Sequence, residues 1–170
     1  MIVDLARIGP VPKKISLILE PDSIELDGEG ITLDGKIEFK GEAERFAGKP
    51  HIRGEIEADI TLDCTRCLEP IARHLEIPFE DVFVGADDQA SSDDNEIALD
   101  DLDESPAVEG KVNIAEIVRE QILLAMPDQA YCREDCKGLC PKCGANRNLI
   151  DCNCADDDID PRWAALKSLR

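Results

Sequence analysis

Eight cysteines in four close pairs constrain this chain more than any other feature of its sequence. The pairs are Cys64 with Cys67, Cys132 with Cys136, Cys140 with Cys143, and Cys152 with Cys154. Four thiolates can hold one zinc ion tetrahedrally, with each sulfur about 2.3 Å from the metal. The spacing therefore predicts up to two structural zinc sites that together use all eight cysteines.

The sharing of cysteines between two metals can be drawn in more than one way. The two pairs between residues 140 and 154 are close enough in sequence to form a self-contained site. The N-terminal pair, Cys64 and Cys67, would then share a metal with Cys132 and Cys136, and we favour this arrangement. A conventional two-knuckle zinc ribbon would instead join the N-terminal pair to the "CPKC" pair. One metal with some thiols free is a third outcome, and iron fits four thiolates as zinc does.

Other cysteine chemistries fit this sequence less well. The N-terminal "MIVDLARIGPVPKK" lacks the pattern of a signal peptide, and no apolar run is long enough to cross a bilayer. These features predict a cytoplasmic protein, in which clustered cysteines bind metal more often than they form disulfides. A thioredoxin-type role is disfavoured for "CTRC" because the motif lies between two strand patterns, not at a helix start.

Enzymatic activity has no support in the sequence. Nucleotide-binding, metalloprotease and serine-hydrolase motifs are all lacking. A catalytic zinc usually recruits histidine or carboxylate ligands and keeps one open position. The two histidines, His51 and His74, lie in the strand-rich part of the chain, far in sequence from most of the cysteines. We therefore expect structural metal and no catalytic residues.

The first half of the chain alternates apolar and charged residues with a period of two. The clearest stretches are "KIEFKGEAE" and "HIRGEIEADITL", joined by the turn-like "AGKPH". This pattern is typical of half-buried antiparallel strands. Shorter strand patterns cover residues 14–20, 30–35 and 71–84. Residues 1–84 are therefore predicted to form a β-rich body, an antiparallel meander.

Helical patterns follow later in the chain. In "VNIAEIVREQILLAMP", Asn113 and Glu116 resemble a capping box and Pro127 ends an apolar stripe. This pattern predicts a main helix within residues 111–131 that packs on the body and covers its sheet. A short helix, "DPRWAALKSL", would close a cysteine-rich zinc module over residues 132–170. The expected fold class is thus α+β.

The formal charge of −19 is unevenly distributed along the chain. Residues from 132 onward carry seven basic and seven acidic side chains, whereas the preceding residues carry 12 basic and 31 acidic ones. Residues 85–110 contain ten acidic and no basic side chains, which predicts an acidic flexible linker. This balance opposes general attraction to phosphate backbones and suits a basic protein partner. Cations do interleave with glycine and amide side chains in the tail, as candidates for RNA or partner contact: Arg133, Lys137, Lys142 and Arg147.

Several of these segments together resemble one known family. "CTRCLEP", "EQILLAMP", "CREDCKGLCPKCGANRN", "CNC" and "DPRWAALKSL" are similar to motifs of the YceD family, in the same order, across residues 64–170. Its members are bacterial proteins with plastid relatives, described as large-ribosomal-subunit RNA accumulation proteins. The family motif often has leucine where this chain has Arg147 and Trp163.

The resemblance implies a function. It implies a cytoplasmic role in the synthesis, processing or stability of 23S ribosomal RNA, with no known enzymatic activity. Together with the charge distribution, it predicts a non-enzymatic ribosome-biogenesis factor. The acidic body would bind a ribosomal protein or an assembly factor, and the cationic rim of the zinc module would lie near RNA. The alternatives are an rRNA-processing enzyme, such as a nuclease, and a zinc or thiol redox sensor.

Overall fold

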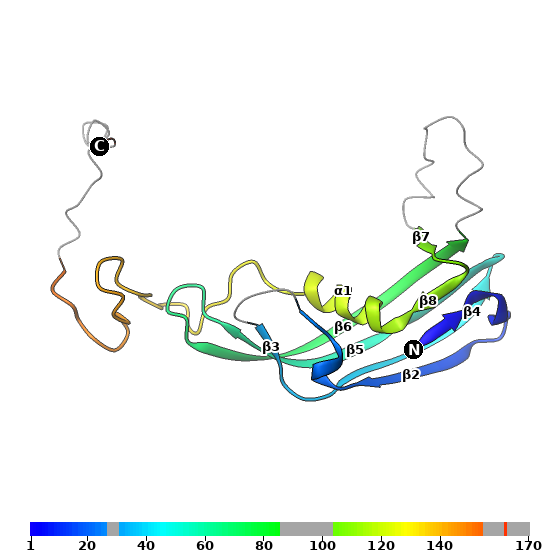
Figure 1. The fold of residues 1–170 in the computed structure, drawn as a ribbon, viewed down its shortest axis with the longest axis horizontal. Helices are drawn as coiled ribbons and strands as arrows, with labels where there is room; N and C mark the ends of the chain where they lie inside the picture. The colour runs from blue at the N-terminus through cyan, green and yellow to red at the C-terminus, as the bar shows by residue number, and fades with distance from the viewer. Residues whose placement is uncertain (27–30, 86–103, 155–161, 163–170) are drawn as a thin grey trace. The chain divides into compact units, whose positions relative to one another are not determined.

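A computed structural model describes residues 1–26, 31–85, 104–154 and 162 (Figure 1). Its strands are β1 (Ile2–Asp4), β2 (Lys13–Leu19), β3 (Ile31–Leu33), β4 (Ile37–Phe46), β5 (Lys49–Asp63), β6 (Pro70–Gly85), β7 (Glu104–Ala107) and β8 (Lys111–Asn113). Its helices are α1 (Ile114–Leu124) and two short 3-10 turns, η1 (Leu5–Arg7) and η2 (Pro21–Ser23). The chain divides into two compact units, which we call the body (Met1–Leu62 with Ile71–Asp128) and the cysteine unit (Asp63–Pro70 with Gln129–Arg170).

The body is built on one main sheet and one small sheet. In the main sheet the strand order is β2-β4-β5-β6-β7, and β3 pairs with β5 beyond the end of β4. The pairs β2–β4 and β4–β5 are antiparallel, whereas β6 and β7 run parallel. The short strands β1 and β8 form the second sheet. The alternating patterns in the sequence therefore correspond to the central strands of this unit.

A two-residue turn joins β4 to β5. Ala47 and Gly48 have φ angles of 50° and 88°, and Phe46 lies opposite Lys49 in the register. Positive φ at both central residues is typical of the turns whose twist matches that of paired strands. The turn that the sequence predicts in "AGKPH" is therefore present.

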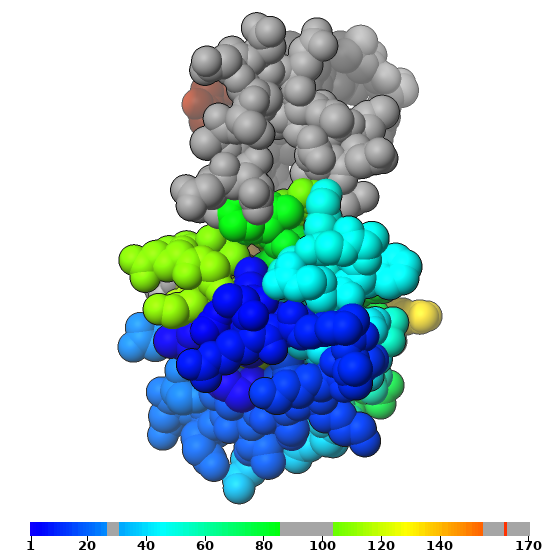
Figure 2. Space-filling model, turned by 90° about the vertical axis from the view of Figure 1, so that its right-hand side faces the viewer, coloured from blue at the N-terminus to red at the C-terminus, as the bar shows by residue number. Residues whose placement is uncertain are grey.

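Arg45 ties this hairpin to the N-terminal segment. Its guanidinium donates hydrogen bonds to the carbonyl oxygens of Leu5 and Ile8, at 2.8 and 3.1 Å. The backbone N–H of Arg45 also donates to the carbonyl of Gly9, at 2.7 Å. Figure 2 shows the N-terminal segment in blue spread beside the cyan hairpin end.

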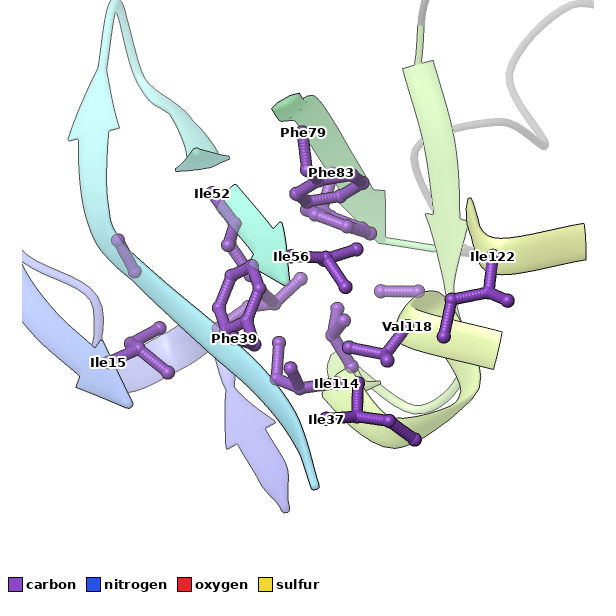
Figure 3. Close-up of a cluster of buried hydrophobic side chains, with 14 of the residues drawn as sticks. Ile15, Ile37, Phe39, Ile52, Ile56, Phe79, Phe83, Ile114, Val118 and Ile122 are labelled. Carbon is purple, nitrogen blue, oxygen red and sulfur yellow. The ribbon is translucent and has the colours of Figure 1, made fainter. Parts of the chain in front are cut away.

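The core of the body is aliphatic, with a few phenylalanines. Figure 3 shows side chains from β4, β5, β6 and α1 gathered in one cluster. On α1, Ile114, Val118 and Ile122 follow the four-residue spacing of one helical face, and all three are fully buried. The helix begins where the Asn113 side chain accepts a hydrogen bond from the N–H of Ala115, at 3.2 Å. Thus α1 forms inside the predicted segment.

The predicted α+β class, a meander covered by one main helix, is wrong. The described residues are mostly β, and the main sheet curls into a half-barrel. Strands as long as β5 and β6, with 15 and 16 residues, accumulate enough twist to curl a sheet. Gly41 faces Gly54 across β4 and β5, and a Cβ on Gly54 would lie 2.5 Å from the carbonyl oxygen of Lys40. This close approach lets the strands bend around their own core.

The remaining predicted segments are described only in part. Strand β7 lies inside the stretch predicted as an acidic linker over residues 85–110, while residues 86–103 lie outside the described part. The predicted helix "DPRWAALKSL" also lies outside it, apart from residue 162. Within the described residues, no helix combines the length and the apolar character that crossing a membrane requires.

Candidate metal centre

The first group of cysteines begins in a tight turn between β5 and β6. The N–H of Leu68 donates to the carbonyl of Cys64 at 2.9 Å, and the N–H of Cys64 donates to the carbonyl of Glu69 at 2.8 Å. Leu68 adopts a φ of 59°, which closes the turn. Cys64 and Cys67 are both buried. The turn thus presents two thiols from one short loop.

The segment after α1 supplies the other two thiols. Thr65 holds this segment through three hydrogen bonds with the backbone of Ala130, between 2.7 and 2.9 Å long. Cys132 and Cys136 follow directly. The sulfur atoms of Cys64 and Cys136 are 3.8 Å apart, and those of Cys67 and Cys132 are 3.6 Å apart.

These distances suit a metal ion. Sulfurs at the corners of a tetrahedron with bonds of about 2.3 Å lie about 3.8 Å from one another. All four sulfurs of this group, which we call the first cluster, lie within 4.8 Å of one another. The donor set therefore suits one tetrahedral, thiophilic metal ion.

The second cluster is local in sequence. The sulfur atoms of Cys140, Cys143, Cys152 and Cys154 also lie within 4.8 Å of one another. The N–H of Gly144 donates to the carbonyl of Cys140 at 2.9 Å, and Gly144 adopts a φ of 71°, which favours glycine. Cys140 is buried, whereas Cys143 is exposed. The structure thus groups the eight cysteines in the arrangement that the sequence favours over the two-knuckle ribbon.

Arg66 links the turn at residues 64–69 to the tail segment. Its guanidinium donates to the carbonyls of Glu134 and Cys136, at 3.3 and 3.1 Å, and stacks on the ring of Tyr131, 4.1 Å from its centre. Its own carbonyl accepts from the N–H of Leu139, at 2.9 Å. Arg66 cannot be recognised from the sequence, because a lone arginine between two cysteines carries no distinctive signal.

Two asparagines make further polar contacts within the cysteine unit. Asn148 donates from its side-chain nitrogen to the sulfur of Cys136, at 3.3 Å, and accepts from the N–H of Lys137, at 2.8 Å. Asn146 donates to a carboxylate oxygen of Glu69, at 3.0 Å, and accepts from the N–H of Asn148, at 3.0 Å. The two asparagines of "GANRN" can be read from the sequence, but the groups with which they form hydrogen bonds cannot.

Hydrogen bonds to sulfur favour the thiolate form of Cys64, Cys136 and Cys140. Burial and the neighbouring thiols instead raise the pKa values of the remaining ligands with a resolved shift: Cys67, Cys132, Cys152 and Cys154. Burial raises the pKa of Cys64, but N–H groups of Cys132, Arg66 and Cys67 outweigh it and lower that pKa to about 6. The N–H groups of Cys143 and Lys142 lower the pKa of Cys140 to about 6. Hydrogen bonding from Asn148 lowers the pKa of Cys136. Metal ions bind thiolates, so these contacts favour metal binding by Cys64, Cys136 and Cys140.

The four candidate contact cations are divided between the clusters. Arg133 and Lys137 flank Cys136 of the first cluster, whereas Lys142 and Arg147 lie in the segment of the second. All four are exposed, and the Nε of Arg133 lies 3.5 Å from a carboxylate oxygen of Asp135. Four thiolates around a divalent ion carry a net negative charge, and this charge partly neutralises the positive charge of the nearby cations.

The fold and the site define a mostly β protein with a separate unit that carries two four-cysteine clusters. Among the described residues, these clusters are the only groups of three or more metal-ligating side chains close enough to share an ion. The sequence model of the family described as "Large ribosomal RNA subunit accumulation protein YceD" matches residues 52–170, which include all eight cysteines. The chain belongs to the YceD family.

Individual proteins are similar to this chain over much of its length. The chain is 26% identical to an uncharacterized protein of Mycobacterium tuberculosis over 170 residues, covering 98% of this chain and 79% of that protein. It is 30% identical to YlbN of Bacillus subtilis over 135 residues, covering 78% and 73%. It is also 30% identical to the chloroplastic "Large ribosomal RNA subunit accumulation protein YCED homolog 1" of Zea mays over 157 residues, covering 79% and 54%. No solved structure matches the chain.

Proposed function

We propose that this protein is a non-enzymatic ribosome-biogenesis factor that supports accumulation of 23S ribosomal RNA and assembly of the large subunit in the cytoplasm. The observation that carries this proposal is the family match over residues 52–170, whose description names large-subunit ribosomal RNA accumulation. The matched residues include both cysteine clusters.

We further propose that each cluster holds one structural zinc ion. Each has four sulfur donors and no histidine or carboxylate donor, which is the ligand set of closed structural sites. A closed site leaves no position for a reacting water molecule. The ions would therefore maintain the shape of the cysteine unit, and any partner would contact its surface.

The charge of the body supports a basic protein partner, such as a ribosomal protein or an assembly factor. Two cations on β4 and β5 are each shared by a pair of carboxylates. Lys40 lies 2.6 Å from Glu38 and 3.6 Å from Glu57. Arg53 lies within 3.4 Å of both Glu42 and Glu44. Acid therefore remains in excess on this face, and a basic surface would complement it. We place the RNA near the cationic rim of the cysteine unit.

Pull-down from cells at moderate salt, with and without ribonuclease, tests this proposal. We expect ribosomal proteins or assembly factors to remain bound after ribonuclease treatment, and precursor 23S RNA to be recovered without it. Replacement of Glu42 and Glu44 by glutamine should weaken the protein contact, whereas Lys137→Ala with Arg147→Ala should weaken only the RNA contact. Recovery of neither ribosomal proteins nor precursor RNA would refute the proposal.

The two alternative functions make different demands. A processing enzyme requires a carboxylate-bound metal or a zinc-bound water, and metal-loaded protein that leaves precursor rRNA intact would argue against it. A redox sensor requires thiols that mild oxidant can reach and that release the metal. Thiols that stay metal-bound under mild oxidant would exclude that role.

A further inference from the structure

One side chain from the segment of the second cluster contacts a ligand of the first cluster. Asn148 belongs to the segment between Cys143 and Cys152, so the second cluster encloses it in sequence. Its side-chain nitrogen nevertheless donates to the sulfur of Cys136, a ligand of the first cluster, at 3.3 Å. Its side-chain oxygen accepts from the backbone N–H of Lys137, the next residue, at 2.8 Å. The amide of Asn148 thus fixes both the sulfur of Cys136 and the backbone of the next residue, Lys137.

The position of Asn148 depends on the fold of its own segment. The N–H of Arg147 donates to the carbonyl of Gly138 at 2.9 Å, and Asn146 accepts from the N–H of Asn148 at 3.0 Å. The N–H groups of Leu149 and Ile150 both donate to the carbonyl of Asn146, at 3.0 Å. The side chains of Leu149 and Ile150 are exposed, so burial of large apolar groups does not hold these residues in place. Cys143 and Cys152 of the second cluster flank this segment, so a metal bound there would add to these hydrogen bonds by fixing the segment at both ends.

From this geometry we propose that Asn148 couples the two metal sites: a metal in the second cluster orders the segment that delivers Asn148 to Cys136. The inference rests on the proposed metal sites. Partners that hydrogen-bond to metal ligands orient them and commonly change metal affinity by about 10–100-fold when removed. Because linkage is reciprocal, each site gains the same factor of affinity from occupation of the other. Asn148 is a positioning residue in this scheme.

The test compares the full-length variant Asn148→Ala with Asn153→Ala. Asn153 is exposed, lies between two ligands of the second cluster, and has no side-chain hydrogen bond among the described contacts. Competition with a chromophoric chelator measures zinc affinity, and NMR of cadmium-loaded protein reports each site as a separate resonance. We expect Asn148→Ala to weaken the first site by about 10–100-fold and to shift its cadmium resonance. Asn153→Ala should do neither.

A double-mutant cycle separates coupling from a purely local contact. Cys152→Ser removes a ligand from the second cluster, and we expect it to weaken the first site by a factor similar to that of Asn148→Ala. In the Cys152→Ser background, Asn148→Ala should then cost little further affinity. An equal loss in both backgrounds would overturn the coupling, as would an Asn148→Ala protein that matches Asn153→Ala.

Failure of this inference is distinguishable from failure of the proposed function. If wild-type protein binds two metal ions but the cycle shows no coupling, only the inference falls. If wild-type protein binds no metal ion in either cluster, the proposed zinc sites fall together with it. The ribosomal role is tested separately, by the pull-down.

Discussion

Folding costs conformational entropy, and the body and the cysteine unit offset this cost in different ways. The body buries isoleucine, phenylalanine and valine from β2, β4, β5, β6, β8 and α1 in one cluster. In the described part of the cysteine unit, the buried hydrophobic side chains are Ala130 and four cysteines, whereas Leu68, Leu149 and Ile150 are exposed. A unit with so little buried apolar surface needs another source of stability, such as a disulfide or a metal.

One chain can therefore contain two units that are stabilised by different interactions. The body is stabilised by the removal of apolar surface from water, and this stabilisation does not require a bound ligand. The cysteine unit depends on sulfur atoms placed at metal-binding distances, so its stability becomes a function of metal concentration. Perturbations that separate these two dependences are therefore the most informative ones.

Removal of metal should have the largest effect, and it should be confined to the cysteine unit. Zinc binding contributes roughly 10–16 kcal/mol to the folding of small zinc peptides. Chelation should therefore collapse the dispersed amide NMR signals of residues 132–154 and leave those of β4 and β5 in place. Cys64→Ser should reproduce the loss around the first cluster, and added zinc should reverse the effect of chelation. Signals in the cysteine unit that survive complete chelation would contradict this comparison.

The converse perturbation is Ile56→Ala in the body. Ile56 is fully buried in the main cluster, and truncation of such a residue costs about 2–5 kcal/mol. Denaturant unfolding followed by far-UV circular dichroism should show this loss, while metal content stays unchanged. Ile18→Ala is the matched control because Ile18 is 55% exposed on β2, so it should change stability little. Loss of bound metal in Ile56→Ala would show that the units are not independent.

A smaller effect is expected at Gly144. Its φ of 71° lies in the left-handed region, and a Cβ there would meet no atom within 4 Å. Alanine would therefore introduce backbone strain of about 1–2 kcal/mol without a clash. We expect Gly144→Ala to lower the metal affinity of the second cluster and to leave unfolding of the body unchanged. Gly9→Ala, with the same open space and no positive φ, serves as the control.

The smallest effect concerns pH. A hydrogen bond to Asp59 raises the pKa of His74, assisted by Glu76 and Glu57. The resulting stability is fully present below the unfolded-state pKa and is lost as pH rises through the folded one. It is slight because both side chains are exposed. Proton NMR should show Asp59→Asn lowering the pKa of His74.

The cysteine unit should respond to pH in the opposite direction. It should lose metal as pH falls, because protons compete for its thiolates.

Sequence reasoning located the central strands because their alternation is long and regular. Eight residues in β4 and twelve in β5 suffice to recognise a period of two, and the turn at Ala47 and Gly48 interrupts it clearly. The curl of the sheet could not be derived in the same way. It depends on twist accumulated along paired strands and on the approach of Gly41 to Gly54, which are properties of the assembled sheet. Strand β7 was also missed, since "ESPA" is short, contains proline and follows an acidic run.

The cysteine clusters were largely predictable, whereas the contacts around them were not. Cysteine spacing is set by the coordination geometry of a metal, so it can be read from the sequence. The contacts of Arg66 and Asn148 depend on how two loops meet after folding. Neither residue lies at a spacing that marks it as a partner of sulfur or of a carbonyl group.

The wide separation of the first cluster along the chain has a consequence for synthesis. Cys64 and Cys136 are 72 positions apart, whereas all ligands of the second cluster lie between residues 140 and 154. A ribosome making this chain exposes Cys64 and Cys67 long before their partners emerge. During that interval the two thiols lack half of their ligand set, and only translation through residue 136 can complete it. The first cluster can therefore be completed only after the elements between its two cysteine pairs, β6 to α1, have been synthesised.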